Sequence, residues 1–108
     1  MGSIIRYIKS TMDLEEIKTD LRSIQRSLET KVNNLDCLMF GSVLRNSRMA
    51  NDVDILIIYK DENQIPIIKQ EFQSLEKVYP LHLNYFTFEE EKELNFITEQ
   101  KAEYLFRL

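Results

Sequence analysis

Two aspartates stand at the start of the most apolar segment of the chain. Asp52 and Asp54 flank Val53 and lead directly into Ile55–Tyr59, the longest unbroken apolar run. The β-branched residues of this segment favour a buried strand. Burying an unpaired carboxylate costs several kcal/mol, so the fold has to supply a cation or a hydrogen-bond donor beside this strand.

The spacing of the two aspartates is suited to holding a metal ion. In a strand, side chains two positions apart point to the same side. The Cα atoms of Asp52 and Asp54 would lie about 6.6 Å apart. Carboxylates at that separation can share one or two divalent cations, and oxygen ligands suit Mg²⁺ or Mn²⁺. A second interpretation stays open, in which the acids are solvated or pair with Arg45 or Arg48.

The segment before the aspartates favours the metal interpretation. Phe40-Gly41-Ser42 follows a short apolar run of strand length, and nine residues separate Ser42 from Asp52. Glycine after a strand lets the backbone turn sharply and approach a ligand, and the N-terminus of a following helix offers N–H groups to an anion. Gly41 and Ser42 are therefore candidate phosphate ligands, and Arg45 in the next loop is a third, since guanidinium groups bind phosphate oxygens.

The rest of the chain alternates between helical and strand patterns. Leu14, Ile17, Leu21, Ile24 and Leu28 form a helical stripe, which packs on a sheet or, as the alternative, forms a coiled-coil seam. The predicted helices cover residues 13–33, 66–78 and from 88 through Tyr104-Leu105, the predicted strands cover 35–40, 53–59 and 81–88, and a short helix or arm containing Ile4, Ile5 and Ile8 comes first. This order predicts an α/β fold, a small mixed sheet flanked by helices.

Length and composition limit the functional classes. A chain of 108 residues predicts one domain. The net charge of −4 argues against bulk binding of nucleic acid. One cysteine and one histidine exclude a disulfide within the chain and a multi-cysteine zinc site, and they fit a reducing, cytoplasmic location. No apolar run approaches the length of about 20 residues that a membrane span needs, so we expect no membrane association.

Leu38-Met39-Phe40-Gly41-Ser42 followed by Asn51-Asp52-Val53-Asp54-Ile55-Leu56-Ile57 resembles the signature of the DNA polymerase beta-like nucleotidyltransferase superfamily. The small size resembles the minimal nucleotidyltransferases, many of which are antitoxins paired with HEPN toxins. The resemblance implies one nucleotidyltransferase-like domain over residues 1–108. It assigns Gly41 and Ser42 to the phosphates, and Asp52 and Asp54 to the catalytic metals.

The sequence departs from the pattern that the resemblance implies in two ways: the spacing from Ser42 to Asp52 is one residue shorter than the family's usual ten, and an acid is missing. These enzymes usually carry a third acid on the next strand, which here reads Leu81-His82-Leu83-Asn84-Tyr85-Phe86. The matching residue is His82 or Asn84. His82 is a candidate base or a structural residue, and Glu89 lies near enough to the strand end to be a candidate for the missing acid.

Two main functional hypotheses follow. In the first, the protein moves a nucleoside monophosphate from a nucleoside triphosphate, with ATP the expected donor, to a hydroxyl such as a tyrosine of a partner toxin. In the second, it is a weak or inactive nucleotidyltransferase-fold antitoxin that acts by binding a HEPN-type partner. In either case the acceptor surface comes from a partner or from a second copy in a homo-oligomer. A third interpretation is an α/β domain whose acids are only structural.

Overall fold

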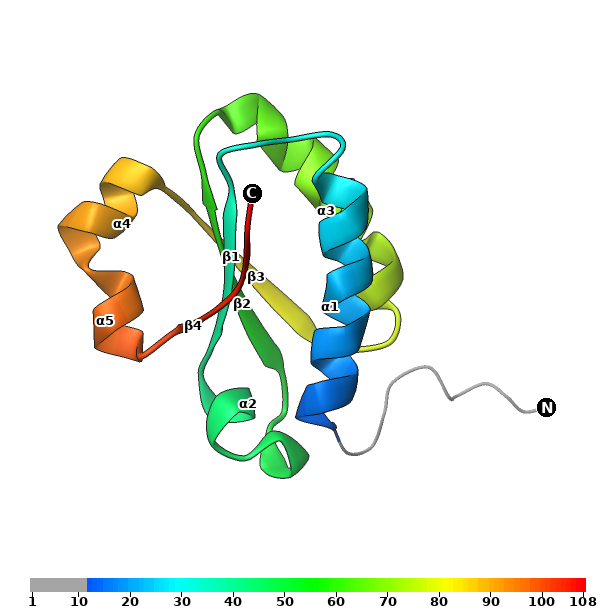
Figure 1. Cartoon of the computed structure of the whole chain (residues 1–108). Coiled ribbons are helices and arrows are strands. Elements are labelled where there is room, and N and C mark those ends of the chain that lie inside the picture. Colours follow the sequence, from blue (N-terminus) through cyan, green and yellow to red (C-terminus); the bar gives the residue numbers. More distant parts are fainter. Residues whose placement is uncertain (1–11) are drawn as a thin grey trace.

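The computed structural model describes residues 12–108, which form a four-stranded sheet between two layers of helices (Figure 1). The helices are α1 (Leu14–Leu28), α2 (Ser42–Arg45), α3 (Ile65–Glu76), α4 (Phe88–Leu94) and α5 (Phe96–Gln100). The strands are β1 (Asp36–Phe40), β2 (Val53–Tyr59), β3 (Leu81–Thr87) and β4 (Glu103–Arg107). Short 3₁₀ turns, η2 (Ser47–Met49) and η3 (Glu62–Gln64), precede β2 and α3. The expected arm at Ile4, Ile5 and Ile8 lies outside the described residues.

The sheet is mixed, as the sequence predicts. Its strand order is β3-β2-β1-β4, with β2 and β3 parallel and β1 antiparallel to both β2 and β4. A parallel pair needs a crossover connection, and α3 provides it between β2 and β3. The parallel pair places the first residues of β2 and β3 at the same end of the sheet, beside the end of β1.

The main core lies between the sheet and the pair α1 and α3. The apolar stripe of α1 is buried there against residues of α3 and of the facing strands. The residues of this core include Ile17, Leu21, Leu28, Cys37, Met39, Ile55, Ile57, Ile68 and Phe72. Each fully buried aliphatic or aromatic side chain contributes about 1.5–3 kcal/mol. The α1 stripe therefore packs on the chain's own sheet, which decides against the coiled-coil alternative.

The opposite face of the sheet is covered only in part. Leu38, Leu56 and Ile58 are buried beneath the segment of α4 and α5. Phe96 of α5 stacks edge-on against Phe40 of β1 and Phe86 of β3, with ring centroids 4.9 and 5.1 Å apart. Beyond this cover, the same face carries Asp54 and His82, which remain accessible to solvent.

Two of the predicted helices differ from the structure. The first ends at Leu28 instead of continuing to residue 33, because the N–H groups of Lys31 and Val32 both turn back to the Leu28 carbonyl. Asn34 then takes a left-handed conformation with φ 55°, which directs the chain into β1.

The prediction of one helix from residue 88 through Tyr104-Leu105 is wrong. Asn95 and Lys101 adopt left-handed conformations and end α4 and α5 after seven and five residues. The following residues form β4, which pairs with β1 and buries Phe106 in the main core. Pairing with a distant strand outweighs the local helical pattern, since β1 would otherwise leave its backbone groups unpaired on that side.

Candidate active site

Asp54 occupies the inner strand of the sheet at its open end. Alternation along β2 places Asp54 on the same face as Leu56 and Ile58. The segment of α5 covers Leu56 and Ile58, and Asp54 is the next residue on that face. It stands opposite Phe40 of β1 and opposite His82 of β3. Its side chain is 22% exposed, so the carboxylate is partly shielded and still open to a ligand.

Gly41 lies directly against the Asp54 carboxylate. Its backbone has φ 85° and ψ −162°, a conformation that is essentially restricted to glycine. A Cβ atom built at Gly41 would stand 2.5 Å from Oδ2 of Asp54. Glycine is therefore required here twice, by the backbone angles and by the acid beside it. The turn after β1 and the second aspartate, Asp54, are therefore in direct contact.

Ser42 and Arg45 bound the short helix that follows Gly41. Ser42 is the first residue of α2 and Arg45 is its last, exposed residue. α2 is only four residues long, so its dipole adds little to anion binding, and the expectation of a helix N-terminus as the main donor is weakened. Roles for Ser42 and Arg45 at phosphate rest on their place beside Gly41 and stay predictions.

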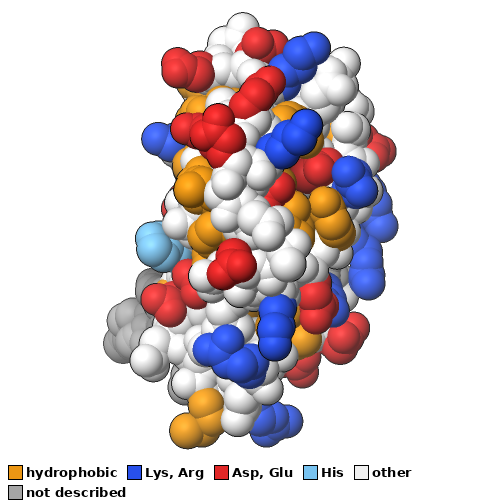
Figure 2. All heavy atoms as spheres, turned by 90° about the vertical axis from the view of Figure 1, so that its left-hand side faces the viewer, with side chains coloured by type: hydrophobic (Ala, Val, Ile, Leu, Met, Phe, Trp, Pro, Cys, Tyr) orange, Lys and Arg blue, Asp and Glu red, His pale blue; other side chains and the backbone are white. Residues whose placement is uncertain are grey.

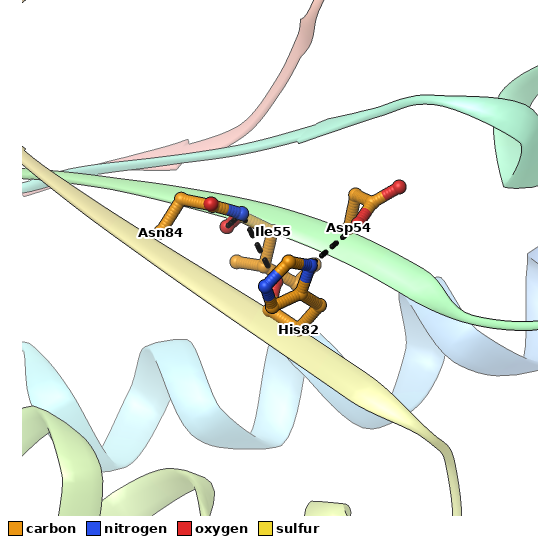
Figure 3. A network of polar contacts seen from close by, with 4 residues as sticks. All are labelled: Asp54, Ile55, His82 and Asn84. Atoms are coloured by element: carbon orange, nitrogen blue, oxygen red, sulfur yellow. Dashed lines mark hydrogen bonds and ion pairs between the residues drawn. The ribbon is translucent and has the colours of Figure 1, made fainter.

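His82 contacts Asp54 across the parallel strands. Its Nδ1 atom lies 3.2 Å from Oδ1 of Asp54, and its side chain is 66% exposed (Figure 3). Asn84, two residues on, donates from Nδ2 to the carbonyls of Ile55 and His82 at 3.3 Å each. The residue of β3 that meets Asp54 is thus His82, while Asn84 ties the backbones of β2 and β3 together. Figure 2 shows the histidine on the open surface with acidic side chains beside it.

Comparison with known proteins agrees with this arrangement. A family model described as Nucleotidyltransferase domain matches residues 21–106, which is most of the chain. The chain belongs to this nucleotidyltransferase family. No curated protein and no solved structure gives a significant match. The family extends the resemblance read from residues 38–57 across nearly all the described elements, from within α1 to β4.

In the described part of this nucleotidyltransferase, side chains alone do not complete a metal site. Within residues 12–108, no group of three or more His, Cys, Asp or Glu side chains could hold one. The strand spacing assumed for the two aspartates holds only for Asp54: Asp52 is exposed in the bend just before β2, and Asp54 follows on the strand. Two carboxylates fit a Mg²⁺ or Mn²⁺ ion whose remaining ligands are phosphate oxygens and water, because Mg²⁺ is commonly bound by one or two carboxylates together with substrate phosphates.

The remaining candidates from the sequence are Arg45 and Arg48 as ion-pair partners of the aspartates, and Glu89 as a third acid. Among the described ion pairs, none joins Asp52 or Asp54 to Arg45 or Arg48, so the alternative of simple charge pairing gains no support. Glu89 does not join the site. It is the second residue of α4, which follows the far end of β3, and it lines a hollow with Asn34, Lys60, Asp61 and Phe88.

Phe96 is the residue near the site that sequence reasoning missed. Its ring contacts the ring of Phe40, the residue that precedes Gly41, and so packs against the end of β1 that leads into the turn. The alternation that puts Phe40 on the same face as Leu38 indicates an apolar partner there, but it does not say which helix supplies it.

No helix among the described residues has the length and apolar character to cross a membrane.

Proposed function

We propose that this nucleotidyltransferase domain transfers a nucleoside monophosphate from ATP to a hydroxyl group, with Mg²⁺ or Mn²⁺ held by Asp52 and Asp54. The observation that carries the proposal is the contact between Gly41 and the Asp54 carboxylate. It brings a glycine turn that suits phosphate and an acid that suits a metal to one point on an open sheet face.

The chain's own residues then have distinct tasks. Because Gly41 has no Cβ, the turn lies directly against Asp54, and a triphosphate bound at the Gly41–Ser42 backbone would lie beside the carboxylate. Arg45 is the exposed last residue of α2, the helix that follows this turn, and its guanidinium group can bind phosphate oxygens. The metal, when bound, would neutralise the triphosphate and polarise its α-phosphorus for displacement of pyrophosphate.

The acceptor comes from outside this chain. His82 is exposed and Asp54 is partly exposed, so a group carried by another molecule can reach both side chains. A hydroxyl carried by a partner protein, such as a tyrosine of a HEPN-type toxin, or by a second copy of this chain fits such a surface.

A second candidate function is an antitoxin that binds its partner with little or no transfer. The observation that favours it is His82, a neutral or cationic side chain where a further carboxylate would complete a three-acid metal site. The two functions differ in a single measurable property, the transfer of label from ATP.

Calorimetry with Mg²⁺ and α,β-methylene-ATP, which cannot release pyrophosphate, tests the site. We expect binding by the wild type and a large loss of metal-dependent affinity in Asp54→Asn. Asp61→Asn is the matched control, since it removes the same charge at η3, where an amide oxygen can still cap the turn. Wild-type affinity in Asp54→Asn would refute the assignment. Incubation with α-labelled ATP and a candidate partner then separates transferase from non-catalytic antitoxin.

A further inference from the structure

The two carboxylate oxygens of Asp54 face different neighbours. Oδ2 lies on the side of Gly41, where a Cβ would approach it to 2.5 Å, whereas Oδ1 lies 3.2 Å from Nδ1 of His82. Figure 3 shows one oxygen directed to the imidazole ring and the other directed away from it. Asp54 therefore separates two sides of the site, one formed by the turn after β1 and the other formed by β3.

In-line displacement uses two such sides. The attacking oxygen and the leaving oxygen lie roughly opposite each other across the phosphorus atom. If the turn at Gly41 and Ser42 holds the pyrophosphate end of the triphosphate, the attacking hydroxyl arrives from the side of His82. The side chain of His82 is 66% exposed, so an acceptor from solution or from a partner can reach it.

The contact with Asp54 also sets which nitrogen of His82 is available. An ionised carboxylate can only accept hydrogen bonds, so the ring nitrogen that faces it carries the hydrogen. In a neutral imidazole this leaves Nε2 as an acceptor. The backbone of His82 is held in place, because Asn84 donates to its carbonyl and to the carbonyl of Ile55 on β2.

We infer that His82 is the general base of the transfer and marks the acceptor side of the site. Nε2 accepts the proton of the acceptor hydroxyl while the hydroxyl oxygen forms the bond to the α-phosphorus. The bond from that phosphorus to the bridging oxygen breaks, and pyrophosphate leaves with the electron pair. The inference rests on the proposed function and adds to it the direction from which the acceptor enters.

The first test reads the tautomer of the ring directly. Because His82 is the only histidine of the sequence, long-range ¹H–¹⁵N spectra in alkaline buffer report on one imidazole. We expect the Nδ1–H tautomer in the wild type, its loss in Asp54→Ala and its retention in Asp52→Ala. The Asp52 variant is the matched control, since it removes the neighbouring carboxylate of the same pair. An Nε2–H tautomer in the wild type overturns the inference.

The second test uses water as the acceptor. In the presence of Mg²⁺, the wild type should slowly hydrolyse α-labelled ATP to labelled AMP and pyrophosphate. His82→Ala should lose about 10²–10⁴-fold of this rate, the usual contribution of a general base, while it keeps its affinity for Mg²⁺ and α,β-methylene-ATP. Added imidazole should restore part of the rate, because the vacated space opens to solvent.

The outcomes separate the inference from the proposed function. A wild type that binds the analogue but forms no AMP, or a His82→Ala variant with an unchanged rate, overturns the role of His82 alone. Loss of analogue binding in His82→Ala also overturns it and makes His82 part of the binding site. A wild type that does not bind the analogue overturns the proposed function, and the role of His82 with it.

Discussion

Asp54 is constrained by a glycine on one side and a histidine on the other. The backbone of Gly41 takes angles that other residues avoid, and the space where its side chain would stand is filled by Oδ2 of Asp54. His82 approaches the other oxygen from the neighbouring strand. The Asp54 carboxylate thus links the turn after β1 to β3, and a substitution of Gly41 or His82 should change its position.

Gly41→Ala is expected to weaken nucleotide binding more than it weakens folding. The left-handed backbone costs about 1–3 kcal/mol for alanine, and the added Cβ displaces the Asp54 carboxylate. Denaturant unfolding and calorimetry with Mg²⁺ and α,β-methylene-ATP measure the two effects. Asn95→Ala is the control, since it also places alanine at a positive φ, 54°, but outside the site. If folded Gly41→Ala binds the analogue as the wild type does, the glycine serves only the turn.

At the scale of single elements, three of the four strands, β1, β2 and β3, were predictable because their signals are local. The apolar runs of β1 and β2 and the alternation in β3 each appear within seven residues or fewer. The pairing of Asp54 with His82 was not predictable in detail, because register depends on how α3 returns the chain to β3. Both His82 and Asn84 therefore remained candidates until the fold placed His82 opposite Asp54.

The C-terminal part was mispredicted for a related reason. Residues 88–105 contain apolar positions that fit a helix, and Phe88–Gln100 are mostly helical. The break to β4 depends on left-handed residues at Asn95 and Lys101 and on a free edge of β1, which is distant in sequence. A lysine in a left-handed conformation has no sequence signal of its own, since glycine and asparagine are the residues that usually occupy it.

Two tyrosines beside α3 should respond in opposite ways to loss of their hydroxyl groups. The Tyr79 hydroxyl donates to Asp20 of α1 at 2.7 Å and has Glu16 at 3.3 Å, whereas the buried hydroxyl of Tyr85 has no partner among the described residues. A hydrogen bond to a charged group contributes about 1.5–3 kcal/mol. We therefore expect Tyr79→Phe to lose stability in urea unfolding and Tyr85→Phe to be neutral or more stable. Equal losses would contradict the contacts between Tyr79 and α1.

The same tyrosine predicts how stability changes in alkaline solution. Burial, followed by the hydrogen bond to Asp20, raises the pKa of Tyr79 above its usual value of 10.0. The folded state then keeps the proton when the unfolded state has lost it, so stability is fully present below pH 10 and falls as the pH rises further. Tyr79→Phe should show a shallower decline of the unfolding free energy above pH 10 than the wild type. An identical slope in both proteins would count against this assignment.

Phe96 tests whether α5 supports the site. Phe96→Ala removes both edge-on ring contacts, and we expect a loss of about 1–3 kcal/mol, less than for a fully buried phenylalanine. Because Phe40 precedes Gly41, binding of the ATP analogue should also weaken. Leu94→Ala is the control, since Leu94 is 56% exposed on α4. Unchanged analogue binding in folded Phe96→Ala would show that β1 holds the turn without help from α5.

For the whole molecule, Cys37 reports on the integrity of the sheet. It is fully buried on β1 between Ile57 of β2 and Phe106 of β4, and burial raises the pKa of its thiol. As the only cysteine of the sequence, it gives a single-site signal with a thiol reagent. We expect slow modification in the folded protein and a clear acceleration in Phe106→Ala, which loosens β4. Leu94→Ala should leave the rate unchanged, and a fast reaction in the wild type would contradict the burial of β1.

The place of β4 in the sheet has a consequence for a chain emerging from the ribosome. β1 lies between β2 and β4, so one of its edges stays unpaired until residues 103–107 have been made. At about 5–20 residues per second, the stretch from Phe40 to Glu103 takes about 3–13 s to synthesise. During that interval the nascent protein displays an apolar strand with a free hydrogen-bonding edge, which is a template for strand addition by other chains. A chaperone or a co-translated partner that covers β1 in those seconds would raise the yield of folded protein, although it touches no residue of the proposed nucleotide site.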